Sequence, residues 1–589
     1  MTDTTIEDHP NRIVETFAQK TILITGVTGF VGKVFLEKLL RTCPEVEKIL
    51  VMIRAKKGKH PNERMADIFS GPLFSLLKKQ KGAEIFQKVE AIPVNLETRD
   101  LSLSSEDREK ITKEVDMIYH CAASVRFDEP LQKIVFLNTR GTKLMLQLAK
   151  ECERLLVFAY VSTAYCHLNE KILYEKTYPP PADPDAIIKI CECLDQETLD
   201  QITNKLLGDI PNTYTFTKAL AEALVANEMD NLPVIILRPS VVIPIWKEPV
   251  VGWTDNINGP AGLLIATGKG VLRTMYCQKE TYADYIPVDI VANLLFCCTF
   301  FYLQKQKRIF NITSSFQHKV TNQEIIEIGR RIVCNDIPLN GVLWYPGGSM
   351  KKWRWHHNLE FLLFQWIPAV VLDGLLILLL MKVQRRISKG YDMFEYYANR
   401  QWDFNNDGTL EAIRTLNPRE RSVYKVDGED VDYYQYFKNC IHAARIYILK
   451  EPDDTIPSAQ KHMERMRILD KVCKIAFTFG LFYVIGTNSG WVRFEFNIVF
   501  VFKYSYCDEI PDDGTDGPVT VRNLADNVWG GGVLGCQALG RLVSLMSETR
   551  LVDQAYAATF TPPGVAPSVR SGGRSGASSL SGGGSAGVL

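Results

Sequence analysis

Short runs of apolar and β-branched residues recur through the first 240 residues, and segments with helical spacing separate them. The runs are almost continuously apolar, which is typical of strands buried on both faces of a sheet. Strands that alternate with helices predict right-handed crossovers and a doubly wound, parallel α/β sheet. The predicted strands span residues 20–26, 48–54, 89–95, 115–123, 155–162 and 232–239.

The segments between these strands place apolar residues at helical intervals. A short lead-in helix or loop covers residues 12–20, and a first full helix spans Val31–Arg41. Residues 63–88 also alternate at helical spacing, and a long helix covers residues 131–152. We therefore expect a Rossmann-type domain in which helical segments connect the strands.

The composition changes near residue 345, shortly before a long apolar segment. Residues 359–381 are mostly apolar and lie between two basic stretches, 350–357 and 382–389. About 20 apolar residues can span a bilayer, but a central Asp373 costs on the order of 3 kcal/mol on insertion scales. Three interpretations stay open: a spanning helix, a re-entrant or in-plane helix, and a buried amphipathic helix. We expect the segment to associate with a membrane.

Composition narrows the class of protein further. The chain has 68 Lys and Arg against 68 Asp and Glu, and zero net charge argues against a nucleic-acid partner held by bulk charge. The 14 cysteines are scattered, and Cys191 and Cys193 have no partner pair at ligand spacing, so we predict reduced thiols and no metal site. The polar, acidic start of the chain is unlike a secretory signal. These features predict a protein whose soluble domain faces the cytosol.

The stretch from Thr21 to Lys33 joins the first predicted strand to the first helix through three glycines. Gly26 allows the tight turn, Gly29 lets the backbone approach a pyrophosphate, and Gly32 lets the helix pack close to the strand. The helix N-terminus then offers free N–H groups and a partial positive charge to the phosphates. A purely structural glycine turn is the alternative. The predicted cofactor contacts in this stretch are Thr25, Gly26, Thr28, Gly29, Phe30, Val31 and Gly32.

Arg54 ends the second predicted strand, about twenty residues after the glycine turn. An NAD-selective site usually carries Asp or Glu there, to bind the ribose 2′-hydroxyl. Arg54, with Lys56 and Lys57 behind it, suits the 2′-phosphate of NADPH instead, although a solvated basic loop has the same composition. Asn95 ends the third strand, where it could meet the adenine, and small residues after the fourth strand leave room for the cofactor. The rest of the predicted cofactor site is Leu96, Ala122, Ala123, Lys218 and Pro239.

Tyr214 and Lys218 are four residues apart, so they share one face of a helix. A lysine ammonium near a phenol favours the phenolate and lowers the tyrosine pKa from about 10. The tyrosine can then exchange a proton with a carbonyl or alcohol oxygen as a hydride moves. Ser162 and Thr163 end the fifth strand, where a hydroxyl can bond the reacting oxygen, and we favour Thr163. We therefore predict that Tyr214, Lys218, Thr163 and Ser162 are catalytic.

The same spacing recurs at Tyr434 and Lys438, far from the nucleotide-binding unit. Spacing alone is a weak signal, because any helix places such a pair on one face. Only Tyr214 lies between the fifth and sixth strands, where the chemistry requires it. We therefore interpret the second pair as part of a helix surface.

These features together resemble the extended short-chain dehydrogenase/reductase superfamily. Longer blocks look like the alcohol-forming fatty acyl-CoA reductases of the male-sterility type, and the resemblance covers about residues 15–480. Asn95 stands where that family usually has Asp. The blocks that carry the resemblance are His120–Glu129, Val161–Cys166, Arg238–Ser240, Glu248–Pro260 and Asp284–Asn293.

The resemblance implies reduction of a long-chain acyl-CoA to a primary alcohol by two NADPH, with release of coenzyme A. Tyr214 would protonate the oxyanion with help from Thr163, while Lys218 would hold the nicotinamide ribose. The insert between Tyr165 and Tyr214 could form a lid over the substrate, or it could be ordinary packing. Arg126 could contact a phosphate or form an ion pair with a neighbouring carboxylate.

The patterns and the resemblance together divide the chain into four parts. The catalytic part would belong to the cytosolic side of an intracellular membrane, either peroxisomal or of the endoplasmic reticulum; no oligomeric state is predicted. The parts are an NADPH-binding and catalytic domain at 15–300 with its substrate-binding part at about 240–345, a membrane segment at 346–390, a helical domain at 391–486 and a Gly/Ser-rich disordered tail at 487–589.

Two other functions remain open at the level of sequence. One is a different extended reductase or epimerase, acting on a sterol, an aldehyde or a nucleotide sugar. The other is a scaffold that binds NADP without catalysis. The long blocks favour the acyl-CoA reductase over the first, and the intact pair of Tyr214 and Lys218 argues against the second.

Overall fold

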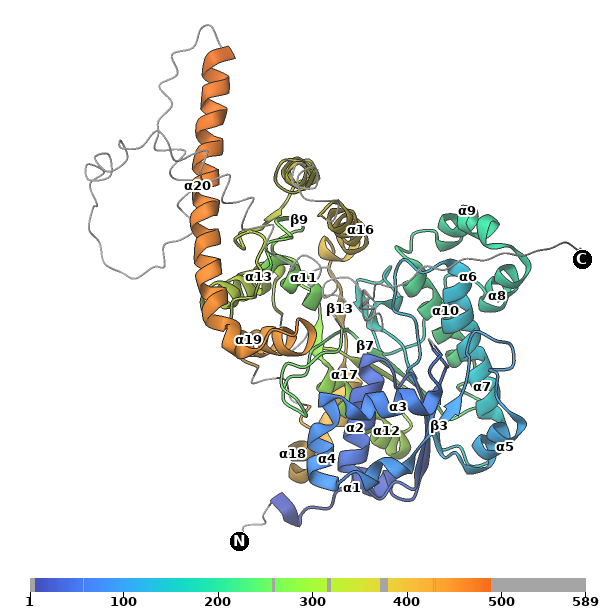
Figure 1. Ribbon diagram of the computed structural model, residues 1–589. Helices are drawn as coiled ribbons and strands as arrows, with labels where there is room; N and C mark the ends of the chain where they lie inside the picture. Colours follow the sequence, from blue (N-terminus) through green and yellow to red (C-terminus); the bar gives the residue numbers. More distant parts are fainter. Residues whose placement is uncertain are drawn as a thin grey trace, which may run out of the picture.

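A seven-stranded parallel sheet forms the centre of the protein, with helices on both faces (Figure 1). The computed structural model describes residues 6–488, apart from residue 57 and segments 257–259, 315–318, 371–379, 427 and 429–430. The strand order is β11-β7-β5-β4-β1-β2-β3, which confirms the predicted doubly wound α/β fold. The predicted tail lies outside the described residues from residue 489 on. The strands are β1 (Thr21–Thr25), β2 (Lys48–Ile53), β3 (Val89–Pro93), β4 (Met117–His120), β5 (Val157–Val161), β7 (Val234–Pro239) and β11 (Ile309–Ile312).

All six predicted strands are present, and β1, β4, β5 and β7 are buried along their whole length. The seventh, β11, is missing from the prediction, because it has only four residues and the polar Asn311 interrupts its apolar pattern. It pairs with β7 through the backbone, from Ile309 opposite Ile236 to Ile312 opposite Pro239. The strand order reverses between β1 and β4, and ligands bind at such a switch point, outside the carboxyl ends of the strands.

Two layers of helices cover the sheet. One face packs against α1 (Arg12–Phe17), α2 (Phe30–Thr42) and α12 (Val288–Lys305), whose apolar residues join the same buried core as β1 and β5. The opposite face packs against α5 (Ser105–Glu114), α7 (Gly141–Glu151) and α10 (Thr213–Asn227). Burial on both faces explains why the strand sequences are almost continuously apolar.

Helix α12 is, within the described residues, the one helix that is long and apolar enough to cross a membrane. It is a core helix here, because 83% of its apolar window is buried inside the protein. Phe296 and Phe301, for example, are almost completely buried.

The long helix predicted over residues 131–152 is present, with a wide turn in its middle. It consists of α6 (Leu131–Ile134), the π-helical turn η4 (Val135–Arg140) and α7. The insert after β5 contains β6 (Ile172–Leu173), α8 (Pro184–Cys193) and α9 (Gln196–Leu207). Apolar residues of α8 and α9 pack against α6 and α10, so this part of the insert is built into the side of the domain.

Residues of the C-terminal half pack against the first half of the chain. Strand β13 (Asp403–Phe404) pairs with β6, and α17 (Asp407–Arg414) lies against β11. Glu420, in α18 (Pro418–Val423), accepts two bonds from the Arg12 guanidinium at 2.9 and 2.6 Å. The remaining elements are η1 (Ile6–Asp8), α3 (Pro61–Ser70), η2 (Pro72–Phe74), α4 (Ser75–Lys81), η3 (Glu84–Lys88), η5 (Ala164–Cys166), β8 (Val241–Ile243), α11 (Pro260–Gly268), β9 (Thr274–Tyr276), β10 (Tyr285–Pro287), α13 (Asn322–Arg331), η6 (Ile332–Asp336), β12 (Ser349–Lys351), α14 (Arg354–Phe361), η7 (Leu362–Trp366), α16 (Leu380–Ala398), α19 (Tyr433–Ala443), η8 (Ala444–Ile448), η9 (Asp453–Thr455) and α20 (Ile456–Asn488).

Candidate active site

The glycine turn after β1 lies against the end of β4, at the switch point of the sheet. Gly26 has φ +79°, and a Cβ there would lie 2.7 Å from the Ala122 backbone nitrogen. A Cβ on Gly32 would overlap the carbonyl oxygen of Gly26, so α2 can approach β1 only with glycine at this position. Gly29 is the N-cap of α2, and its N–H donates to the Gly26 carbonyl at 2.9 Å.

The first turn of α2 therefore presents its N–H groups toward the space above the sheet edge. Backbone N–H groups at a helix N-terminus have no partner inside the helix, and the helix dipole favours an anion there. Phe30, Val31 and Gly32 form this turn, and Thr28 precedes it. The arrangement fits the pyrophosphate of a dinucleotide, as the glycine spacing predicts.

Thr25 has a different role from the predicted one. Its side chain is fully buried, and its Oγ1 lies 2.8 Å from His120 Nδ1 and accepts from the Ala122 N–H at 3.1 Å. Thr25 therefore joins the ends of β1 and β4 and does not face the cofactor space. Leu96 is buried as well, with its Cβ against Gly141.

Arg54 and Asn95 line one cavity of about 580 Å³, at the carboxyl ends of β2 and β3. Lys56, Glu97 and Ser102 also line this cavity. The Arg54 guanidinium donates to Glu97 at 2.8 Å, and its side chain is 48% exposed, so it remains accessible to an anion. In a doubly wound sheet the adenosine half of a dinucleotide extends over the ends of these strands, and the basic side chains of the cavity suit a 2′-phosphate.

We expect the Arg54→Ala variant to lose NADPH affinity roughly ten- to a hundredfold, because a hydrogen bond to a charged group contributes about 1.5–3 kcal/mol. Binding of NADH, which has no 2′-phosphate, should stay the same. Titration of nucleotide fluorescence measures both affinities. Arg108→Ala is the matched control, since Arg108 is also a half-exposed arginine paired with a carboxylate, Glu151. Equal losses for both nucleotides would contradict the role of Arg54.

The catalytic tyrosine lies at the start of α10. Asn212 caps this helix by accepting from the Thr215 N–H at 2.9 Å, which sets Tyr214 in its first turn. The Tyr214 ring is half-buried and stacks on Phe127 with centroids 5.7 Å apart. The Thr163 side chain lies close enough to Tyr214 to lower its pKa, and Thr163 is the N-cap of η5, directly after the end of β5. The structure thus brings Tyr214 and Thr163 together as the sequence predicts.

The expected effect of Lys218 on Tyr214 is not found. Burial raises the pKa of Tyr214 well above its usual value, and the nearby Thr163 hydroxyl offsets this only in part. Lys218 does not point at the phenol: its Nζ donates to the Val161 carbonyl at 2.6 Å and lies 3.3 Å from the Tyr160 hydroxyl. Tyr214 is therefore a neutral phenol, which is the form that can give a proton to an oxyanion.

Lys218 is buried between α10 and β5. Burial lowers its pKa to about 8, while Cys166, Cys121 and Glu222 act in the opposite direction. Ser162 is turned away from Tyr214, because its Oγ donates to Glu222 at 2.6 Å. Of the two hydroxyls at the end of β5, only that of Thr163 meets Tyr214, so the geometry favours Thr163 as the residue that contacts a substrate oxygen.

Comparison with known proteins agrees with this geometry. Residues 24–295 match the NAD-binding family described as male sterility protein, and residues 364–451 match a second family with the same description. Fatty acyl-CoA reductase 1 of Rattus norvegicus is 38% identical over 470 residues, which cover 77% of this chain and 90% of that protein. The chain belongs to the fatty acyl-CoA reductase family. Other relatives are fatty acyl-CoA reductase wat of Drosophila melanogaster, at 33% identity over 80% of this chain and 91% of that protein, and fatty acyl-CoA reductase 2 of Mus musculus, at 33% over 83% and 96%.

Asn138 belongs to this reductase site, although no sequence pattern marks it. Its Nδ2 donates to the Ser124 carbonyl and to Thr217 Oγ1, both at 3.1 Å, and its Oδ1 accepts from the Ser124 N–H at 2.8 Å. It therefore ties the loop after β4 to the residue before Lys218. Asn138 lies in the wide turn η4, and such turns occur frequently at functional sites. The nearby Arg126 pairs with Asp128 at 3.1 Å, in line with the ion-pair alternative.

Tyr397 joins the two matched segments of the reductase at the active site. It comes from α16, in the second segment, and contacts the start of α10, in the first. The Asn212 Nδ2 donates to its hydroxyl at 2.8 Å, and Thr215 Oγ1 lies 3.0 Å away. Its ring lies 5.5 Å from that of Phe127, the ring on which Tyr214 stacks. The C-terminal segment therefore helps to hold Tyr214 in place.

We expect Tyr397→Phe to lower kcat roughly three- to tenfold, because loss of a hydrogen bond of about 1 kcal/mol loosens the cap of α10. Steady-state rates with NADPH and an acyl-CoA measure the effect. The neighbouring Tyr396→Phe is the control, since Tyr396 stacks on Trp402 and not on Phe127. Equal rates in both variants would contradict a role for the Tyr397 hydroxyl.

Proposed function

We propose that the protein reduces a long-chain fatty acyl-CoA to the primary alcohol, with two NADPH and release of coenzyme A. One observation carries the proposal: a neutral Tyr214 lies near Thr163 and the buried Lys218, at the carboxyl edge of a dinucleotide-binding sheet. The relatives named fatty acyl-CoA reductase supply the class of substrate.

The side chains supply proton transfer and oxyanion stabilisation. The glycine turn and Arg54 would hold NADPH, which would supply the hydride. Thr163 and Tyr214 together offer two hydroxyls to the thioester carbonyl oxygen, and Tyr214 gives its proton as negative charge develops there. As the resulting hemithioacetal collapses to the aldehyde, its hydroxyl proton returns to Tyr214, and the departing coenzyme A thiolate takes a proton from solvent. The same two hydroxyls then serve the aldehyde in a second round.

Lys218 supports both rounds through its charge. With a pKa of about 8, the Lys218 amine is mostly protonated at neutral pH. Its position between α10 and Val161, at the end of β5, suits contact with the nicotinamide ribose. His120, by contrast, stays neutral because burial lowers its pKa to about 3. It holds Thr25 and Thr142 and takes no part in proton transfer.

Purified protein incubated with NADPH and acyl-CoA thioesters of increasing chain length tests this proposal. The expected products are the alcohol and coenzyme A, at two NADPH oxidised per acyl chain. Release of aldehyde as the end product would contradict the second round. Turnover of a sterol or a nucleotide sugar without turnover of acyl-CoA would overturn the proposal, and binding of NADPH without any turnover would favour a scaffold.

Membrane association is the second part of the proposal. Part of the predicted segment, residues 371–379, lies outside the described residues. The helical residues before it expose apolar side chains, and so does the second half of α20. Phe364 and Phe477 join these two stretches, with ring centroids 5.7 Å apart. This apolar surface consists of Leu359, Leu362, Leu363, Phe364, Trp366, Ile367, Val370, Ile468, Val472, Ile475, Phe477 and Phe479.

The surroundings of the apolar surface suit a bilayer. Trp353 and Trp355 are 59% and 66% exposed at its edge, next to the basic Lys352 and Arg354. Aromatic and basic residues of this kind lie at membrane–water interfaces, and contiguous exposed apolar patches mark contact surfaces. We therefore place the reductase on the cytosolic side of the endoplasmic reticulum or peroxisomal membrane, where NADPH and acyl-CoA are accessible.

We expect the double variant Phe364→Glu, Phe477→Glu to weaken binding to lipid vesicles at least tenfold. Two charges on the apolar surface would have to enter the bilayer interface, and the vesicle-bound fraction after sedimentation measures the effect. Ile6→Glu is the control, because Ile6 is 56% exposed in η1, outside that surface. Unchanged binding of the double variant would exclude this surface as the membrane contact.

A further inference from the structure

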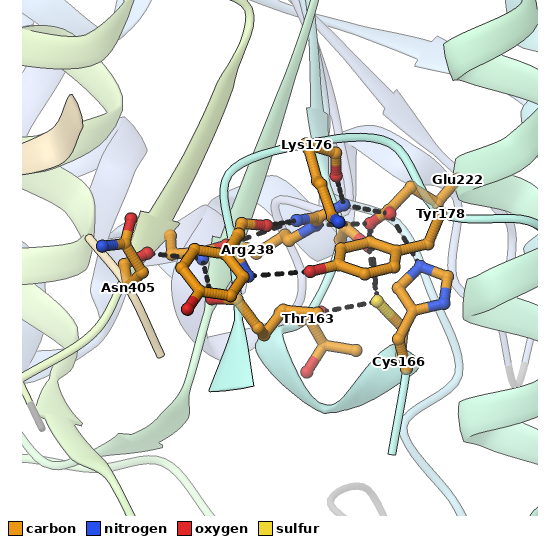
Figure 2. Close-up of polar contacts among 12 residues, drawn as sticks. Thr163, Cys166, Lys176, Tyr178, Glu222, Arg238 and Asn405 are labelled. Carbon is orange, nitrogen blue, oxygen red and sulfur yellow. Dashed lines mark hydrogen bonds and ion pairs between the residues drawn. The ribbon is translucent and has the colours of Figure 1, made fainter. Parts of the chain in front are cut away.

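A buried carboxylate, Glu222, collects hydrogen bonds from three elements beside the active site (Figure 2). Its Oε1 accepts from Arg238 Nη2 at 2.6 Å and lies 3.0 Å from His167 Nε2. Its Oε2 accepts from Ser162 Oγ at 2.6 Å and from Arg238 Nε at 3.0 Å. Arg238 is itself completely buried, so the ion pair is fully desolvated. None of these contacts is used by the proton transfer described above.

The position of Glu222 links the two elements that carry the reacting hydroxyls. It lies one turn after Lys218 and two turns after Tyr214 on α10, so the three side chains share a face. Its partner Ser162 directly precedes Thr163 on the other element. The Cys166 thiol adds a second link, since Sγ lies 2.9 Å from the Thr163 carbonyl and 3.5 Å from Glu222.

We propose that Glu222, held by Arg238, is the positioning residue of the active site: it fixes α10 against the end of β5, so that Thr163 meets Tyr214 and Lys218 stays in place. This inference rests on the proposed function. The carboxylate also occupies the Ser162 hydroxyl, which leaves Thr163 as the only hydroxyl of the pair that faces Tyr214. Arg238 further donates to the carbonyls of Tyr174 and Lys176, at 3.0 and 2.8 Å, and so anchors the start of the insert.

The charges of the cluster agree with a fixed ion pair. Burial raises the pKa of Glu222, but Arg238 and His167 outweigh it and hold that pKa well below its usual range. Burial lowers the pKa of His167, but its contacts with Cys166 and Glu222 raise it to about 10, so His167 is a cation. Cys166, His167 and Glu222 are of the types that ligate metals. A metal ion would have to displace two cations already bound to the carboxylate, which argues for the ion pair.

Glu222 also acts on Lys218 through its charge. Removal of that charge should lower the pKa of Lys218 below about 8, because burial then acts with less opposition. The rate of the enzyme as a function of pH should fall where Lys218 loses its proton, and this basic limb of the pH–rate profile should then move to lower pH. The other titratable groups that contact Lys218 or act on its charge are His120, Cys121, Tyr160 and Cys166, and Cys166 also contacts Glu222.

The test compares Glu222→Gln, Ser162→Ala and Glu420→Gln in the full-length protein. Glu420→Gln is the matched control, since Glu420 is also a buried carboxylate bonded twice by an arginine, but in α18, outside the active site. For Glu222→Gln we expect kcat to fall at least tenfold, KM for NADPH to change less than twofold, and the basic limb of the pH–rate profile to move to lower pH. Ser162→Ala should lower kcat severalfold without moving the limb. Glu420→Gln should lower the melting temperature and leave kcat and the pH profile as in the wild type.

A readout independent of turnover is the pH dependence of Lys218 acetylation, measured by competitive labelling and mass spectrometry. Its midpoint should be lower in Glu222→Gln than in the wild type. A normal kcat with an unmoved midpoint would overturn the positioning role, and so would a loss of kcat that merely follows the fraction of Glu222→Gln that is unfolded. A stoichiometric metal present in the wild type and absent from Glu222→Gln would also overturn it. A wild type that does not reduce acyl-CoA contradicts the proposed function, whereas the labelling result still decides the role of Glu222.

Discussion

The Tyr214→Phe variant should reduce acyl-CoA about 10²- to 10⁴-fold more slowly than the wild type, which is the range that a positioned general acid contributes. The ring would still stack on Phe127, so the fold and NADPH binding should be unaffected. What is lost is the proton for the oxyanion and one of the two hydroxyls that hold it. The rate of NADPH oxidation with a long-chain acyl-CoA, together with NADPH affinity, measures the two effects separately.

The chain contains its own control for this experiment. Tyr434→Phe removes the hydroxyl of the second Tyr-x-x-x-Lys copy, on α19. Tyr434 donates to Asp336 at 3.0 Å, and Lys438 pairs with the same carboxylate at 2.7 Å, so this copy is a helix surface as predicted. We expect wild-type rates for it. If Tyr214→Phe kept even a tenth of the wild-type kcat, Tyr214 could not be the general acid.

The raised pKa of Tyr214 changes what a pH profile reports. A phenol that stays neutral throughout the usual range cannot give rise to a basic limb near neutral pH. Lys218, with a pKa of about 8, can do so, and activity should decline as it loses its proton. The sequence-based expectation that the lysine activates a phenolate is therefore replaced by a division of roles, in which burial keeps the acid protonated and the lysine supplies charge elsewhere.

The fold was predictable because burial leaves a strong mark on sequence. Six strands covered on both faces are almost continuously apolar, and the alternation with helices determined the parallel topology. Short elements lack this mark: β11 has a central asparagine, and β13 and β6 have two residues each. The packing of residues 403–426 against the first domain was not predictable either. Its contacts join residues far apart in the sequence, such as Arg12 and Glu420, which are separated by 408 residues.

The candidate site likewise contains residues that the sequence predicts and residues that it does not. Glycines and the Tyr-x-x-x-Lys spacing are local patterns with a chemical reason, so sequence finds them. Asn138, Tyr397 and the ion pair of Glu222 with Arg238 act through contacts between distant segments, and no local pattern marks them. Thr25 shows the opposite error: it adjoins the glycines in sequence, but β1 is buried on both faces and β4 takes up its hydroxyl. The class of substrate came from family resemblance and not from any of these residues.

The Gly26→Ala variant should lose both stability and NADPH binding, for two reasons that add. A left-handed backbone with φ +79° costs a non-glycine residue roughly 1–2 kcal/mol. The new Cβ would also lie 2.7 Å from the Ala122 nitrogen and 2.8 Å from its Cα, and this backbone must move to make room at a cost of about 1–3 kcal/mol. The movement would shift the chain after β4 away from β1, where Ala122 and Ala123 are predicted to line the cofactor space. We therefore expect NADPH affinity to fall at least thirtyfold.

Gly82→Ala separates strain from displacement. Gly82 has φ +75°, close to that of Gly26, but nothing lies within 4 Å of the Cβ that the substitution would add. This variant should lower the melting temperature through strain alone and leave NADPH affinity unchanged. The contrary outcome is an equal loss of melting temperature in both variants, with unchanged NADPH affinity. It would show that the glycine turn tolerates a Cβ and that the closeness of the turn to β4 does not shape the cofactor site. A selective loss of NADPH binding in Gly26→Ala would locate the requirement for glycine at the contact with Ala122, because a positive φ is common to both positions.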